Sequence, residues 1–61
     1  MNQEIISKKK KISLVPMMPE EAISEMEKLG HESFLFLNME TEKPCMIYSR
    51  FDGTFGLIET E

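Results

Sequence analysis

The stretch from Glu32 to Glu59, ESFLFLNMETEKPCMIYSRFDGTFGLIE, decides the fold of this chain. It contains three short apolar runs separated by polar turn residues, a pattern typical of neighbouring antiparallel strands. The runs are Phe34–Leu37, Cys45–Tyr48 and Phe55–Ile58. Apolar side chains occupy successive positions in each run, so they point to both sides of the sheet. We therefore expect a three-stranded antiparallel meander with two apolar faces.

The pairing of these strands can be estimated from their turns. We expect strands over residues 32–37, 44–51 and 54–59. Asp52-Gly53 predicts a two-residue hairpin, because a type I′ turn needs positive φ at both central positions. Such a turn would set Tyr48 opposite Leu57. The longer polar connection before residue 44 is predicted to set Leu37 opposite Pro44.

Cross-strand partners share a face of the sheet, so this register assigns every apolar residue to one side. The first predicted face collects Phe34, Phe36, Cys45, Ile47, Gly56 and Ile58. The second collects Leu35, Leu37, Met46, Tyr48, Phe55 and Leu57, with Arg50 at its margin. We assign the first face to the helix, because Gly56 would leave room for a close approach. A slip of one residue would exchange side chains between the faces.

A single helix is predicted over residues 19–29. Pro19 suits the first helical position, where its missing N–H costs nothing. Ala22, Ile23, Met26 and Leu29 form one apolar stripe, and Gly30 suits a left-handed C-terminal cap. One helix covers one side of the sheet. The second face would be an exposed apolar patch of a kind that soluble monomers rarely carry.

The N-terminal part is predicted to contain a tail and one short strand. We expect residues 1–9 to be a linker remnant or an added tail, and residues 10–61 to be one domain. Ile12 and Leu14 alternate with polar residues, which predicts a short strand over residues 10–15 that Pro16 ends. The fold class is therefore α+β, a small β-α-β-β-β domain that forms a homodimer through its second sheet face. The predicted interface residues are Leu35, Leu37, Met46, Tyr48, Phe55 and Leu57.

Size and composition limit the ways in which this domain could gain stability. The chain has 61 residues, a net charge of −4 and one cysteine. A domain this small is marginal alone and usually gains stability from disulfides, metals or oligomerisation. Cys45 has no partner for an internal disulfide, and with His31 it supplies two of the four usual zinc ligands. We expect no metal and no cofactor. The lone cysteine and the missing export signal favour a cytoplasmic location.

Few residues could carry chemistry. His31 and Cys45 lack the further groups that a catalytic constellation needs, so we expect no enzyme, no small-molecule substrate and no membrane span. Lys8, Lys9, Lys10 and Lys11 form a basic run in an otherwise acidic chain. This run supports an alternative function, a nucleic-acid-binding module that also uses Arg50. A solvated linker explains the run equally well.

The chain also resembles a known family, the C-terminal domain of long-form ribosome hibernation promoting factors, historically called sigma-54 modulation proteins and related to the ribosome-associated inhibitors. About three quarters of the chain matches in one collinear order. The matching stretches are Pro16-Met17, Glu20-Glu21-Ala22-Ile23, Met26-Glu27, Leu29-Gly30-His31, Phe34, Phe36, Asn38, Glu40-Thr41, Tyr48, Arg50, Asp52-Gly53 and Gly56-Leu57-Ile58-Glu59. Met18 departs from the usual Asp and Leu37 from the usual Arg; Leu37 makes the second face more apolar.

The resemblance implies a role in translation regulation. Such domains homodimerise and pair two ribosomes into an idle state under stress or in stationary phase. An N-terminal domain, absent from this sequence, binds the small ribosomal subunit. By this resemblance the chain is the dimerisation domain of a ribosome hibernation factor.

Overall fold

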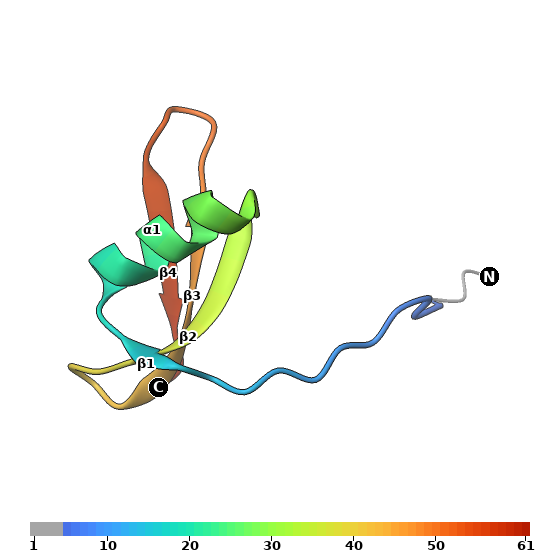
Figure 1. The fold of residues 1–61 in the computed structure, drawn as a ribbon, viewed down its shortest axis with the longest axis horizontal. Coiled ribbons are helices and arrows are strands. Elements are labelled where there is room, and N and C mark those ends of the chain that lie inside the picture. The colour runs from blue at the N-terminus through green and yellow to red at the C-terminus, as the bar shows by residue number, and fades with distance from the viewer. Residues whose placement is uncertain (1–4) are drawn as a thin grey trace.

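A computed structural model describes residues 5–61 and has the element order β1-α1-β2-β3-β4 (Figure 1). Residues 5–15 form neither helix nor strand. The elements are β1 Pro16–Met17, α1 Pro19–Leu29, β2 Ser33–Asn38, β3 Lys43–Ser49 and β4 Phe55–Glu59. The α+β class and the β-α-β-β-β order are confirmed. Part of the expected tail, residues 1–4, lies outside the described residues.

The helix α1 spans the predicted residues, and both ends are capped. Met18 stands at the N-cap, and its side chain is no substitute for Ser or Asp. The carboxylate of Glu21 instead accepts a hydrogen bond from the Met18 N–H at 3.0 Å, one half of a capping box. At the other end Gly30 has φ 69°, and the N–H groups of Gly30 and His31 donate to the carbonyls of Glu27 and Met26. These two bonds form a Schellman motif, which explains the stop at Leu29.

The first strand is not where the sequence placed it, since residues 10–15 are unpaired and β1 is Pro16–Met17. It pairs in parallel with the end of β2. The hydrogen bonds run from Leu37 N–H to Val15 O and from Met39 N–H to Met17 O, both at 3.1 Å. The carbonyls on either side of Pro16 make this pairing, so the missing N–H of proline does not interrupt it. Proline was wrongly taken as a strand stop.

The sheet has the order β1-β2-β3-β4, with β2, β3 and β4 antiparallel. The predicted pairing of β2 with β3 is confirmed, with Leu37 opposite Pro44 and Leu35 opposite Met46. The loop between them is held by Asn38, which is buried. Its side-chain oxygen accepts from Glu40 N–H at 2.9 Å, and its carbonyl accepts from Glu42 N–H at 2.7 Å.

The predicted pairing of β3 with β4 is wrong by one residue. Tyr48 lies opposite Gly56, and Ile47 lies opposite Leu57. The loop has three residues instead of two: Gly53 N–H donates to Arg50 O at 3.3 Å, and Arg50 N–H donates to Thr54 O at 2.9 Å. Gly53 has φ 84°, so a type I turn is followed by one left-handed residue, the usual three-residue hairpin. The shift of one residue turns β4 over.

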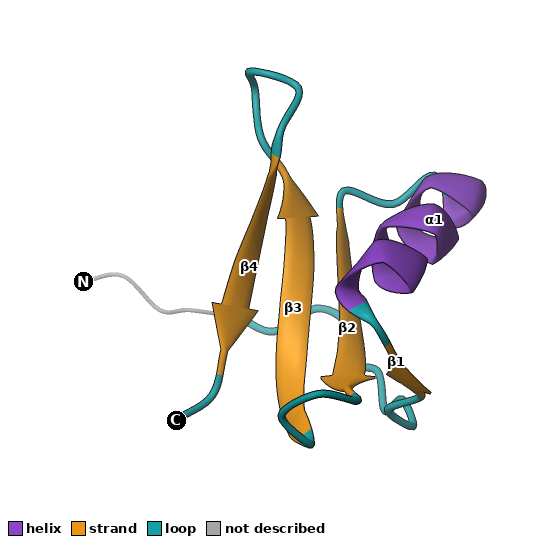
Figure 2. Ribbon diagram, turned by 90° about the vertical axis from the view of Figure 1, so that its left-hand side faces the viewer, coloured by secondary structure: helices purple, strands orange, loops and turns teal. Residues whose placement is uncertain are grey.

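The core lies between α1 and the sheet. Ala22 and Met26 from the helix meet Phe36, Cys45 and Ile47 from β2 and β3, and all five are at most 3% exposed. The helix packs mainly on β2 and less on β3, and Figure 2 shows it over the β1–β2 half of the sheet. The predicted helix face is therefore confirmed for β2 and β3. Gly56, however, does not face the helix, because β4 is turned over.

Candidate interaction surface

Within residues 5–61, no helix or strand covers the side of the sheet away from α1, although Lys10 and Ile12 line a pocket there with Leu35 and Met46. We call this side the open face. Its apolar members come from β2, β3 and β4; they are Leu35, Leu37, Met46, Tyr48 and Ile58. Leu35 and Ile58 are 46% and 53% exposed, and the other three are half-buried. Antiparallel sheets that face water on one side normally carry polar residues there, so this face is unusual.

Tyr48 lies on the open face near the hairpin end of β3. It lies directly opposite Gly56, and a Cβ added at Gly56 would overlap the Tyr48 ring. The ring therefore lies flat over the glycine backbone, a cross-strand arrangement in which an aromatic side chain covers a strand glycine. This contact gives the open face a large apolar surface that ends in a phenol hydroxyl.

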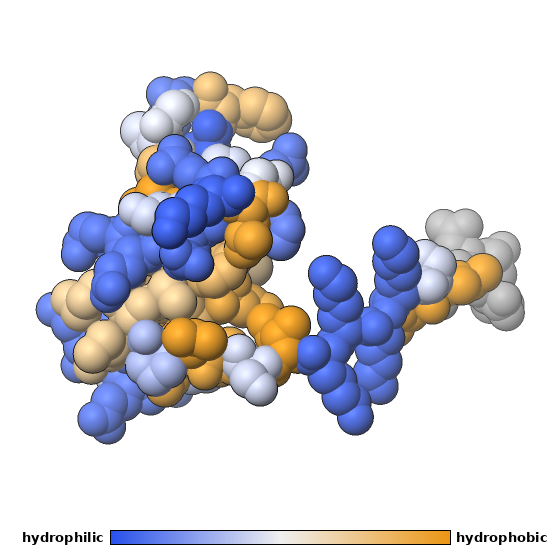
Figure 3. Space-filling view, in the orientation of Figure 1, coloured by the Kyte–Doolittle hydropathy of each residue, from blue (hydrophilic) through white to orange (hydrophobic). Residues whose placement is uncertain are grey.

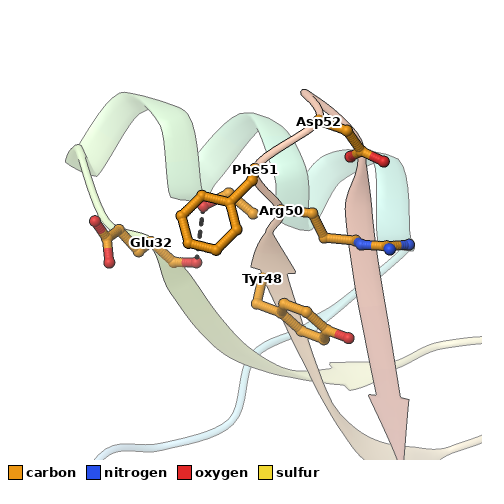
Figure 4. A pocket seen from close by; sticks show the side chains of 6 residues that line it. Glu32, Tyr48, Arg50, Phe51 and Asp52 are labelled. Atoms are coloured by element: carbon orange, nitrogen blue, oxygen red, sulfur yellow. Dashed lines mark hydrogen bonds between the residues drawn. The ribbon is translucent and has the colours of Figure 1, made fainter.

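An open pocket of about 520 Å³ adjoins Tyr48 at the hairpin end of the sheet. Its lining residues are Glu32, Tyr48, Ser49, Arg50, Phe51 and Asp52. Figure 4 shows Arg50 and Glu32 pointing to opposite sides of it. The phenyl ring of Phe51 is fully exposed at the tip of the hairpin. The open face thus has an apolar centre and a charged end, the usual layout of a protein interface.

The structure separates the six predicted interface residues into two groups. Leu35, Leu37, Met46 and Tyr48 share the open face. Phe55 and Leu57 lie on the helix side of β4, where Phe55 packs against the core. The sequence reasoning missed Ile58 and gave Gly56 the wrong side. The signal for this was present, because Asp-Gly also fits a three-residue loop with Gly in the left-handed position.

The four predicted nucleic-acid-binding lysines all lie in the exposed segment before β1. Figure 1 shows this segment running away from the folded body, and Figure 3 shows its hydrophilic side chains projecting from it. Arg50 lies at the β3–β4 hairpin, at the other end of the molecule (Figure 1). The lysines and Arg50 therefore do not form one site.

His31 and Cys45 are also far from forming a site together. His31 is exposed just beyond α1, whereas the Cys45 side chain is 2% exposed within the core. The pocket that His31 lines, on the β2 side of the sheet, does not include Cys45. Burial and a hydrogen bond to Glu59 raise the pKa of the Cys45 thiol, which keeps it protonated and unreactive. This matches the behaviour of a structural core cysteine.

Glu59 links the end of β4 to the β2–β3 loop. Its carboxylate accepts hydrogen bonds from Thr41 Oγ1 at 2.6 Å and from Cys45 Sγ at 3.5 Å. These bonds, with the bond from Thr41 as the larger cause, lower the pKa of the Glu59 carboxyl.

Within residues 5–61, no group of three His, Cys, Asp or Glu side chains could hold a metal ion. None of the helices in this part of the chain is long and apolar enough to span a bilayer.

Residues 1–57 match the family described as "Sigma 54 modulation/S30EA ribosomal protein C terminus". The chain belongs to this family. Among curated proteins, a "Ribosome hibernation promotion factor" from Staphylococcus aureus (strain COL) is 44% identical over 59 residues. The alignment covers 97% of this chain and 31% of that relative, so the chain spans about a third of the length of the protein it matches. The resemblance to hibernation factors that the sequence analysis drew is confirmed for this S30EA C-terminal domain.

Proposed function

We propose that this S30EA C-terminal domain is the homodimerisation module of a ribosome hibernation factor. The observation that carries the proposal is the open face, an apolar surface on the side of the sheet away from α1, which packs on the β1–β2 half of the other side. Another copy of the same face is the simplest cover, since a two-fold axis makes one patch serve both partners. The proposed function is binding without catalysis, in the cytoplasm, where ribosomes are.

The proposed interface joins the open faces of two copies. Leu35 and Ile58 are the most exposed apolar side chains on it and would lose the most contact with water. Burial of apolar surface stabilises by about 25 cal/mol per Å², offset in part by the entropy of association. Tyr48 is the expected hot spot, because its large ring is already held in place by Gly56 and loses little freedom on binding.

The family assignment supports a role for the proposed dimer in ribosome hibernation. The name of the Staphylococcus aureus relative speaks of ribosome hibernation, and this chain aligns with about a third of it. In the proposed full-length protein, another domain binds the small ribosomal subunit, and this domain joins two such proteins. Two ribosomes are then held together and kept from translating.

The test compares two leucines with the same exposure on opposite sides of the sheet. Leu35 on the open face and Leu57 on the helix side are both 46% exposed. We expect sedimentation equilibrium to show a dimer for the unaltered chain and for Leu57→Asp, and a monomer for Leu35→Asp. The charge added to the open face would be buried without a partner in the dimer.

Comparing Leu35→Asp with Leu57→Asp distinguishes a loss of the dimer interface from a general loss of folding. Far-UV circular dichroism should show an intact fold for both variants. A Leu35→Asp chain that is folded and fully dimeric would overturn the open-face interface. Loss of the dimer only in Leu57→Asp would place the contact on the helix side of β4.

A further inference from the structure

The segment before β1 is a basic arm whose charge the folded body does not neutralise. We define the arm as residues 5–15; it contains Lys8, Lys9, Lys10 and Lys11, all exposed. Among the described residues the ion pair is Lys28 with Glu25, at 3.5 Å, and the four arm lysines form none. Removing these four charges from the total of −4 leaves −8 on the rest of the chain.

We infer that this arm binds the phosphate backbone of a single-stranded nucleic acid. The inference does not depend on the proposed dimer. Four adjacent ammonium groups are the side chains that neutralise phosphates and release their counterions. The acidic body would be repelled by the same polyanion, so binding would be confined to the arm. Lys10 and Ile12 of the arm line a pocket with Leu35 and Met46, and the arm extends from there away from the body (Figure 1).

The shape of the arm favours a strand of nucleic acid over a flat anionic membrane. The arm has neither helix nor strand structure, and hydrophilic side chains leave it in more than one direction (Figure 3). The arm therefore presents no single basic face to a flat surface, whereas a flexible strand can follow lysines that point in more than one direction.

The arm contacts would read charge and not sequence. Residues 5–15 contain no aromatic side chain on which a base could stack, and no Arg, Asn or Gln for base edges. Binding through lysine–phosphate contacts therefore predicts similar affinity for RNA and DNA strands, since these contacts do not distinguish the 2′-hydroxyl.

The experiment measures fluorescence anisotropy of labelled oligouridylate with the 61-residue chain across a salt series. We expect log K to fall with log salt with a slope of up to about −2.8, from roughly 0.7 per contact on single strands and four contacts. Replacing all four arm lysines by Gln should weaken binding at low salt by at least about tenfold. Replacing them by Arg should preserve binding.

The matched control changes the two body lysines, Lys28→Gln and Lys43→Gln, and should leave binding unchanged. Circular dichroism of all variants checks that the fold persists. Three results would overturn the inference: no binding at low salt, equal binding after the four Gln substitutions, or tighter binding to phosphatidylglycerol vesicles than to oligouridylate. A tenfold preference for oligouridylate over oligothymidylate would overturn the phosphate-only mode.

Discussion

The two faces of the sheet are built from equally apolar strands but end in different environments. On the helix side, Phe36 and Ile47 are almost completely buried under Ala22 and Met26. On the open face, one residue away along the same strands, Leu35 is 46% exposed and Met46 is half-buried. Alternation along a strand produces this difference, because successive side chains point to opposite sides.

The comparison shows what each face contributes. The helix side holds the monomer together, since it contains the fully buried side chains. The open face adds little to the monomer and has the composition of an interface. Substitutions on the helix side should therefore change the stability of the single chain, and those on the open face should change its association.

The largest expected effect is on the helix side. Phe36 is fully buried, and Phe36→Ala should lower the free energy of unfolding by about 3–5 kcal/mol, because it leaves a cavity in the core. Urea denaturation at several protein concentrations measures it. The loss should be the same at each concentration, whereas a smaller loss in Leu35→Ala should grow with concentration as dimers form.

A second variant keeps this comparison usable if Phe36→Ala does not fold. Phe36→Leu retains most of the volume and should cost less than about 1.5 kcal/mol. If Phe36→Ala and Leu35→Ala lowered the free energy of unfolding equally at every protein concentration, this would contradict the claim that the helix side stabilises the monomer and the open face mediates association.

A smaller effect is expected where Tyr48 covers Gly56 on the open face. Gly56→Ala should destabilise the fold by about 1–3 kcal/mol, because the new Cβ overlaps the Tyr48 ring and displaces it. Tyr48 is the only tyrosine in a chain without tryptophan, so its fluorescence reports the displacement directly. Urea denaturation gives the free energy.

The double variant isolates the contact. In a Tyr48→Ala background, Gly56→Ala should be neutral or stabilise by up to about 1 kcal/mol, because alanine suits a strand better than glycine. The same destabilisation with and without the Tyr48 ring would show that the overlap is not its cause.

The smallest effect concerns the link between β4 and the β2–β3 loop. The pKa of Glu59 is lowered in the folded protein, so its carboxylate contributes stability at pH values above its ordinary pKa. That contribution is lost as the pH falls through the lowered folded pKa. The stability difference between the unaltered chain and Glu59→Gln should therefore be present at neutral pH and disappear in strong acid.

Thr41 supplies the control for this pH dependence. Thr41→Ala removes the main hydrogen bond to the carboxylate, so it should move the pKa of Glu59 back toward its ordinary value. A Glu59→Gln difference that is the same at pH 3 and pH 7 would contradict the role of the carboxylate. Urea denaturation across this pH range measures both variants.

Much of this architecture follows from local sequence. The boundaries of α1 were predictable, because Pro19 and Gly30 act through backbone geometry that needs no distant partner. The alternating side chains of β2 and β3 and the connection between them similarly predicted which residues share a face. The family resemblance was readable from the same residues.

The register between β3 and β4 was decided by strand pairing in the folded structure. Asp52-Gly53 is compatible with a two-residue or a three-residue loop, and the hydrogen bonds of Arg50 with Gly53 and Thr54 choose the longer one. The sequence by itself thus determined the elements, the helix caps and the existence of two apolar faces. Only the tertiary structure placed Ile58 beside Tyr48 and Leu57 on the far side, because strand register depends on contacts between segments that local preference does not specify.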